Sequence, residues 1–424
     1  MSDTKKPELL VPAGSLEVLK TAVRYGADAV YIGGEAFSLR AKAKNFTIEE
    51  MAEGIKFAHD RGVKVYVTAN ILAHDSDFDE AAKYFGELKK LSVDAILIAD
   101  PGLFLTEQEL CPEIPVHIST QANNTNSRTF EFWHNLGVKR VVCARELTLD
   151  EIKELRKSIP EDMEIECFIH GAMCISYSGR CLLSAYMTGR SANRGECTHP
   201  CRWKYSVVEE QRPGEYFPVE ENDRGTFIFN SKDLCMIEHV PELVEAGISS
   251  FKIEGRMKTA LYVATVARTY RKAIDDLFAS RETYINNLPW YRSEIGKCTY
   301  RQFTTGFYFG KPDESAQIYE NSTYVVESVF LGIIEEVTGD GKIRLTQKNK
   351  FCVGDTIEVM KPDGRNIEVR VAAIESEDGT KQESAPHACQ VVYVTLETDK
   401  EADWCEGDLL RADAATSPKT QENI

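Results

Sequence analysis

Residues 25–32 read Tyr-Gly-Ala-Asp-Ala-Val-Tyr-Ile, and near copies of this stretch recur at residues 91–98, 136–143 and 246–253. Each copy joins the end of a segment of helical period to a short, continuous apolar run. Glycine at three of the four junctions is typical of a helix C-cap. Continuous apolarity is typical of a strand that helices cover on both faces of a parallel sheet. The repeated stretch therefore predicts helices that alternate with parallel strands.

Apolar runs of this kind occur eight times, each followed by a segment of helical period. They lie at residues 9–12, 29–32, 63–68, 95–99, 116–119, 138–144, 165–169 and 250–253. Eight such units predict an α/β fold, a TIM-like (β/α)8 barrel that is either closed or irregular. Because active sites of this fold lie at the C-terminal ends of the strands, the polar residues there are candidate site residues. They are Asn70, Asp100, Gln121, Arg145, His170, Lys252, Glu254 and Arg256.

The chain changes character after the barrel, and its 424 residues are enough for a large and a small domain. Short alternating runs separated by Gly339-Asp340-Gly341 and Pro362-Asp363-Gly364 predict a small antiparallel β-barrel. We therefore divide the chain into a barrel at residues 1–280, a connecting segment at 281–320, a β-barrel domain at 321–412 and a frayed tail at 413–424.

The seventh strand-to-helix connection, residues 171–238, is far longer than the usual connection of about two to six residues. Long loops within compact domains are usually functional. This loop carries Cys174, Cys181, Cys197 and Cys201, separated by six, fifteen and three residues. Four thiolates in one loop can hold a zinc ion or an iron-sulfur cluster, and four unrelated thiols are a third alternative. The spacing favours iron-sulfur, because only the last pair has the short spacing of zinc knuckles.

Charge and targeting signals limit the classes of function. No apolar leader and no run of the roughly 18 apolar residues that a membrane span needs is present, so we expect a cytoplasmic protein without membrane contact. A net charge of -17 argues against nonspecific coating of nucleic acid. Residues 170–205, however, carry five cationic side chains and one carboxylate. The predicted nucleic-acid-binding residues are Arg190, Arg194, Arg202 and Lys204.

The segments around the cysteines resemble a known family. Residues 166–174, Glu-Cys-Phe-Ile-His-Gly-Ala-Met-Cys, and residues 178–184, Ser-Gly-Arg-Cys-Leu-Leu-Ser, are similar to the signature of peptidase family U32, the collagenase-like peptidases. Further similar segments lie at residues 8–14, 26–33, 193–202, 230–234 and 252–256. The resemblance covers residues 8–280, and the β-rich tail resembles the C-terminal domain of the family.

The resemblance implies the branch of the family that hydroxylates the tRNA wobble uridine to 5-hydroxyuridine with prephenate as a required metabolite. It further implies a 4Fe-4S cluster on Cys174, Cys181, Cys197 and Cys201, with Cys235 as an alternative to Cys201. Expected partners are tRNA, prephenate and a second subunit of the same family. Two alternatives stay open, namely a peptidase, as the family name says, and a noncatalytic RNA-binding or metal-dependent scaffold protein. The chain has neither a Gly-x-Ser-x-Gly elbow nor a His-Glu-x-x-His zinc helix, so the peptidase alternative rests on the name.

Roles for the remaining polar residues follow from their chemistry. We predict catalytic roles for His170, Arg145, Glu254 and Arg256. Arg145 and Arg256 have forked guanidinium groups that suit the two carboxylates of prephenate, although structural ion pairs with acids such as Glu254 are an alternative. Next to the cluster loop, His170 is placed to contact a cluster sulfur or carry protons. Two further expectations are that Ser231 and Asp233 cap a helix that begins near Met236, and that Cys143 and Cys167 fill the barrel interior.

Overall fold

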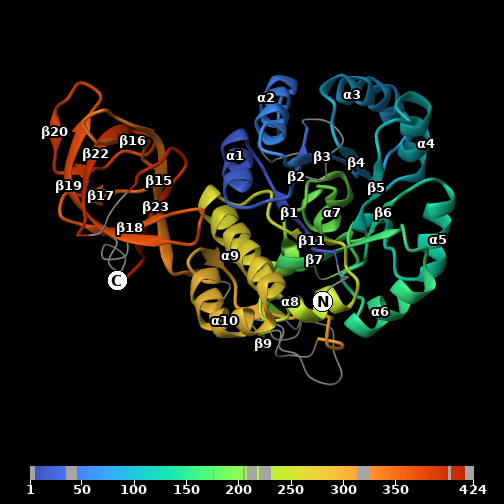
Figure 1. The fold of residues 1–424 in the computed structure, drawn as a ribbon. Helices are drawn as coiled ribbons and strands as arrows, with labels where there is room; N and C mark the ends of the chain where they lie inside the picture. The colour runs from blue at the N-terminus through green and yellow to red at the C-terminus, as the bar shows by residue number, and fades with distance from the viewer. Residues whose placement is uncertain are drawn as a thin grey trace.

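The computed structural model describes residues 5–34, 45–174, 176–203, 206–207, 217–218, 231–312, 324–399 and 403–415. They form a large barrel unit and a smaller β-rich unit beside it (Figure 1). The predicted fold class, a TIM-like barrel followed by an antiparallel β-domain, is confirmed. Within the described ranges, no helix is long and apolar enough to cross a membrane. Most of the predicted frayed tail lies outside the described residues.

Parallel strands form the barrel wall, and each overlaps one of the eight apolar runs. They are β1 (Glu8–Pro12), β2 (Ala29–Gly33), β3 (Lys64–Ala69), β4 (Ala95–Ile98), β5 (Val116–Ile118), β6 (Arg140–Val142), β7 (Glu164–Ala172) and β11 (Ser250–Ile253). They pair in the order β11-β1-β2-β3-β4-β5-β6-β7, and β11 also pairs with β7. The barrel is therefore closed.

Helices surround the wall on the outside (Figure 1). They are α1 (Leu16–Arg24), α2 (Ile48–His59), α3 (Phe78–Leu91), α4 (Pro101–Leu110), α5 (Ser127–Asn135), α6 (Leu149–Ser158), α8 (Val240–Glu245), α9 (Ala260–Ala279) and α10 (Arg281–Ile295). Local sequence determines where several helices begin. Reciprocal capping boxes precede α2, formed by Thr47 with Glu50, and α6, formed by Thr148 with Glu151. Asp100 caps α4 through the backbone N–H groups of residues 102 and 103, which gives this candidate a structural role.

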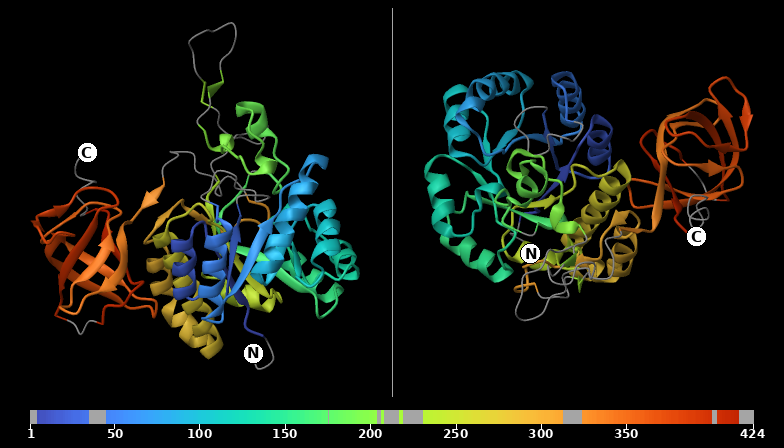
Figure 2. Two further views of the ribbon diagram at one scale, coloured as in Figure 1. Left: turned by 90° about the horizontal axis from the view of Figure 1, so that it is seen from above. Right: turned by 180° about the vertical axis from the view of Figure 1, so that it is seen from behind.

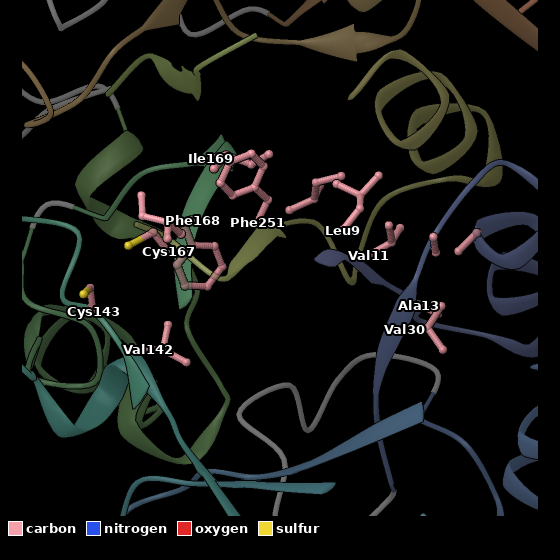
Figure 3. Packing of buried hydrophobic residues seen from close by; sticks show 14 of the residues in the cluster. Leu9, Val11, Ala13, Val30, Val142, Cys143, Cys167, Phe168, Ile169 and Phe251 are labelled. Carbon is pink, nitrogen blue, oxygen red and sulfur yellow. The ribbon is translucent and has the colours of Figure 1, made fainter. Parts of the chain in front are cut away.

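Side chains alternate between the two faces of the wall, as the strand period requires. In β1, Leu9 and Val11 join the main apolar core with the surrounding helices, whereas Leu10 belongs to a small cluster made only of strand residues. Cys143 and Cys167 belong to the main core (Figure 3). Glu166 and Phe168, the neighbours of Cys167 on β7, contact Lys252 and Arg145 inside the barrel, so Cys167 faces outward and the expectation that it fills the interior is wrong. For Cys143 that expectation stays a prediction.

The N-terminal half of the barrel interior is closed by buried charges, which we call the lower ion network: Glu8, Arg140, Glu164, Glu166 and Lys252. Arg140 pairs with Glu8 and donates to Glu164 at 2.7 Å and to Glu166 at 3.4 Å. Lys252 donates to Glu166 at 2.7 Å. Burial lowers the pKa of Lys252, and it would raise that of Glu8, but Arg140 outweighs burial and holds the Glu8 pKa below its ordinary value.

The long seventh connection covers the opposite end of the barrel (Figure 2). We call residues 173–203 the cysteine loop; it contains α7 (Leu183–Thr188) and the short 3-10 turns η3 (Ala192–Arg194) and η4 (Pro200–Arg202). The connection continues through β8 (Ser206–Val207), β9 (Phe217–Pro218) and β10 (Asp233–Cys235). β10 pairs antiparallel with β7. The expected helix cap at Asp233 is wrong, because this strand pairing extends the backbone there and α8 begins only at Val240.

The C-terminal unit is a closed antiparallel barrel with short accessory strands. The strands from the end of α10 onward are β12 (Thr299–Tyr300), β13 (Phe303–Thr304), β14 (Val325–Val326), β15 (Ser328–Val337), β16 (Ile343–Thr346), β17 (Phe351–Cys352), β18 (Thr356–Met360), β19 (Asn366–Ser376), β20 (Lys381–Gln382), β21 (Ser384–Ala385), β22 (Val391–Glu397) and β23 (Leu409–Asp413). The order β18-β23-β15-β16-β22-β19 closes through β18 and β19. The two predicted turns lie between β15 and β16 and between β18 and β19, as expected.

The two units meet at a buried polar junction. Tyr25 donates its hydroxyl to the Met360 carbonyl at 2.7 Å, and Glu294 on α10 pairs with both Arg268 and Arg411. Burial would raise the Glu294 pKa, but the two guanidinium groups outweigh burial and lower that pKa to about 2. The β-domain is therefore fixed to α9 and α10, on the outer side of the barrel and away from α7 (Figure 2).

Candidate active site

A cavity of about 180 Å³ lies at the C-terminal ends of the strands, beneath the cysteine loop. Its walls combine residues that follow the strands, such as Asn70, Gln121, Arg145 and Arg256, with residues of the loop. This is the end of the barrel at which the fold places its active sites. The predicted position of the site at the strand ends is where the cavity lies.

All four candidate ligand cysteines line this one cavity. Cys174 and Cys197 are exposed, Cys181 and Cys201 are half-buried, and none of the four is in a disulfide. The backbone N–H of Leu183 lies 3.4 Å from Cys181 Sγ, a contact that stabilises a thiolate. Within the described residues, no three His, Cys, Asp or Glu side chains converge into a metal-binding group. The donor set thus fits a soft metal group in chemistry, while the thiols share a cavity without converging on one point.

Cys235, the alternative fourth ligand, lies elsewhere. It is half-buried on β10, its sulfur is 3.9 Å from the Tyr270 hydroxyl, and it does not line the cavity. Burial raises its pKa to about 12, so it stays a protonated thiol. The structure groups Cys201, and not Cys235, with the other three cysteines.

Arg145 reaches into the cavity from the end of β6 and is held on three sides. It donates to the Ala172 carbonyl at 2.7 Å, lies 3.7 Å from Glu254, and stacks on the Phe168 ring at 3.9 Å from the ring centroid. Both the predicted functional position and the predicted structural pair with Glu254 are therefore present. The guanidinium is pre-oriented at the cavity wall, which reduces the entropy that a bound carboxylate would have to offset.

Arg256 is buried at the cavity wall and donates to Thr68 Oγ1 at 2.9 Å. Its backbone fits closely against Gly14: a Cβ atom on Gly14 would lie 1.9 Å from the Arg256 carbonyl oxygen. This contact explains why the segment at residues 8–14 ends in glycine. Among the described residues that line the cavity, Arg145, Arg256 and Lys252 are cationic and Glu254 is a carboxylate, and Lys252 is already paired with Glu166.

A small polar group that the sequence only partly indicated completes the wall. Asn70 donates to Ser119 Oγ at 3.2 Å and to Gln121 Oε1 at 3.1 Å, and the Ser119 hydroxyl also donates to Gln121. Asn70 and Gln121 were candidates because they follow β3 and β5. Ser119 was not, because it ends an apolar run and nothing in the sequence distinguishes it from a strand residue.

His170 does not line the cavity. The pairing of β7 with β11 shifts register after Lys252, so that Ile253 pairs with His170 rather than with residue 169. Such a bulge changes the face to which the following side chain points. His170 lies among Tyr262, Tyr270 and Phe303, and burial lowers its pKa to about 3. It is neutral at physiological pH, and its predicted role beside the cluster stays a prediction that this placement does not favour.

The predicted RNA-contacting cations differ from one another in their surroundings. Arg190 is exposed just after α7. Arg194 instead forms a two-pronged pair with Asp77 at 2.7 and 2.9 Å, which fastens the cysteine loop to the start of α3. This pair lowers the Asp77 pKa to about 2. The side chain of Arg202 and the whole of Lys204 lie outside the described residues.

Comparison with known proteins adds an independent observation. Residues 14–318 match the sequence model of Peptidase family U32, and residues 327–411 match that of the Peptidase family U32 C-terminal domain. The chain is 43% identical to tRNA hydroxylation protein P1 of Bacillus subtilis (strain 168), covering 93% of each chain. It is 38% identical to tRNA hydroxylation protein P of Escherichia coli (strain K12), covering 94% of this chain and 96% of that protein. Over 65% of this chain and 40% of the other protein, it is 37% identical to the 23S rRNA 5-hydroxycytidine C2501 synthase of Escherichia coli (strain K12).

Proposed function

The chain belongs to peptidase family U32, and we propose that it is an RNA hydroxylase that converts the tRNA wobble uridine to 5-hydroxyuridine. The observation that carries the proposal is the meeting of four thiols and three cationic side chains on one cavity. The chain is similar to a tRNA hydroxylation protein along 93% of its length. Its similarity to an rRNA 5-hydroxycytidine synthase supports hydroxylation of RNA as the class of reaction.

The residues that would hold a 4Fe-4S cluster are Cys174, Cys181, Cys197 and Cys201. When bound, such a cluster supplies one-electron transfer. These residues all belong to the cysteine loop and face the same cavity as Arg145 and Arg256. A cluster held there would lie beside any small molecule bound at the strand ends.

The cationic walls suit a dicarboxylate, which supports prephenate as the small molecule. Arg145 follows β6 and Arg256 follows β11, both line the cavity, and each has a fork that can bind one carboxylate with paired hydrogen bonds. Phe168 stacks under Arg145 and keeps its plane fixed. Glu254 lies 3.7 Å from Arg145, and Lys252 is paired with Glu166.

One contact favours the hydrolase alternative. Cys197 Sγ lies 3.9 Å from His199 Nδ1, and a thiol beside an imidazole is the beginning of a cysteine nucleophile. A thiolate that ligates metal cannot serve as that nucleophile. Peptide hydrolysis by metal-free protein, lost in Cys197→Ser, would therefore support the peptidase and contradict the proposal.

The test is nucleoside analysis of tRNA from a strain that lacks this gene and is complemented with single variants. We expect 5-hydroxyuridine derivatives to disappear without the gene, return with wild type, and stay absent with Cys174→Ser, Cys181→Ser, Cys197→Ser or Cys201→Ser. Cys405→Ser, at an exposed thiol of the β-domain, is the matched control and should restore them. Anaerobically purified wild type should carry about four irons per chain. Unchanged nucleosides in the deletion strain, or stoichiometric zinc in active protein, would contradict this assignment.

A further inference from the structure

The short helix α7 turns apolar side chains toward solvent as well as toward the protein. Leu183 lines the cavity and Ser184 is fully buried, so this face of the helix forms part of the cavity roof. Its outer face carries Leu182, Tyr186 and Met187, which are 69%, 87% and 40% exposed. Residues four apart on a helix are neighbours, so Leu182 and Tyr186 lie side by side. An apolar face of this kind, turned to solvent, marks an interaction surface.

Further exposed rings lie on the same loop. Tyr177 precedes α7 and is 46% exposed, and Trp203 follows η4 and is 45% exposed. η4 itself packs against α7. We call the five exposed apolar side chains of the cysteine loop, Tyr177, Leu182, Tyr186, Met187 and Trp203, the roof face. Within the part of the chain that the structure describes, aromatic side chains exposed to this degree are otherwise spread singly over distant elements, as Phe132 on α5 is.

The charges around the roof face are positive. Arg180 and Arg190 flank α7, and both are exposed. The single carboxylate of the cysteine loop is Glu196, in a chain whose net charge is -17. A local excess of cations with exposed aromatic rings is the composition that binds single-stranded nucleic acid, since the cations attract phosphates and the rings stack on bases.

We propose that the roof face is a stacking platform for the unpaired bases of an RNA loop, with Tyr186 as the central ring. The proposal rests on the proposed function for its ligand class and adds how the RNA is recognised. Because α7 carries exposed side chains on one face and cavity-lining residues on the other, bases stacked outside would hold a neighbouring nucleotide near the cavity. A duplex has no free base faces and gains nothing from the platform.

The experiment is equilibrium binding of two RNA probes, a stem-loop and a fully paired duplex with the same stem, to the purified full chain. Tyr186→Ala should weaken binding of the stem-loop about tenfold, because base–aromatic stacking accounts for roughly 1–3 kcal/mol per base. Tyr186→Phe keeps the ring and should bind like wild type. Phe132→Ala, at a 56% exposed ring on α5, is the matched control and should also bind like wild type. Duplex binding should be the same in all four proteins.

Salt dependence separates stacking from charge. Tyr186→Ala should leave the slope of log Kd against log salt unchanged, whereas Arg190→Ala should reduce it by about 0.7, the value of one single-strand phosphate contact. Stem-loop affinity unchanged in Tyr186→Ala, or loss of self-association in that variant in place of loss of RNA binding, would overturn the platform. Both binding measurements are made without turnover. Unchanged RNA binding in Tyr186→Ala, in a protein that still forms 5-hydroxyuridine, would contradict the platform alone. Weakened RNA binding in that variant, in a protein that forms no 5-hydroxyuridine, would contradict the proposed function alone.

Discussion

The two halves of the barrel interior differ in how their charged side chains are arranged. In the lower ion network, Arg140 and Lys252 are each matched by buried carboxylates at hydrogen-bond distance. At the other end, Arg145 and Arg256 line the cavity beside Glu254. The first arrangement pairs its charges internally, whereas the second lies at the cavity where we propose that an anion binds. One wall of strands thus supports a closed, stabilising end and an open, binding end.

The largest effect on the free energy of unfolding should come from disrupting the lower ion network at the closed end of the barrel. Arg140→Met leaves Glu8 without its main counter-charge and leaves Glu166 with Lys252 alone, and removing one partner of a buried network costs about 3–5 kcal/mol. Urea unfolding measures this loss. Arg128→Met removes an exposed pair with Glu131 and should cost less than about 1 kcal/mol. A similarly small loss for Arg140→Met would mean that the network does not stabilise the barrel.

The same kind of change at the open end should alter activity and not stability. Arg256→Lys keeps the charge but loses the fork, and we expect 5-hydroxyuridine formation to fall about tenfold, with Arg256→Ala and Arg145→Ala lower still. The free energy of unfolding and the iron content should stay close to wild type. Arg365→Lys, on the exposed surface of the β-domain, is the control. Full activity in all three cavity variants would rule out the carboxylate site, and lost iron would assign the arginines to the fold.

The pH dependence of unfolding should also test the role of the buried charges at the closed end of the barrel. Arg140 holds the folded-state pKa of Glu8 below its ordinary value of 4.5 despite burial. A lowered carboxyl pKa contributes stability that is present above the unfolded value and lost as pH falls below it. The difference in unfolding free energy between wild type and Arg140→Met should therefore narrow as the pH is lowered from 4.5 toward about 3. A constant difference over that range would contradict the charge-based account of the closed end.

The smallest effect should come from weakening the ion pair between Arg194 and Asp77, which fastens the cysteine loop to the start of α3. Asp77→Asn weakens the pair with Arg194, which is partly exposed, so global stability should change by less than about 1 kcal/mol. The cysteine loop should nevertheless be cleaved faster in limited proteolysis, because its attachment to α3 is looser. Asp60→Asn, which removes an exposed helix pair, should leave the cleavage rate unchanged. Equal rates in both variants would show that other contacts fasten the loop.

Much of the fold could be predicted because it depends on local pattern. Continuous apolar runs located every barrel strand, and the position of polar residues after those runs located Asn70, Gln121, Arg145 and Arg256 at one cavity. His170 was misplaced because a register shift between two strands distant in sequence changed its face. The pair of Arg194 with Asp77 was equally invisible, since 117 residues separate the partners. Pairings over such distances leave no local periodicity.

Gly14 has a consequence for genetics. It carries no chemistry, yet any side chain there would collide with the backbone of Arg256, since its Cβ would lie 1.9 Å from that carbonyl oxygen. A substitution at Gly14 would shift the guanidinium that faces the cavity without changing a single cavity side chain. In a screen of random variants for loss of function, position 14 should therefore score as intolerant as the cysteines, and inspection of reactive groups alone would never nominate it.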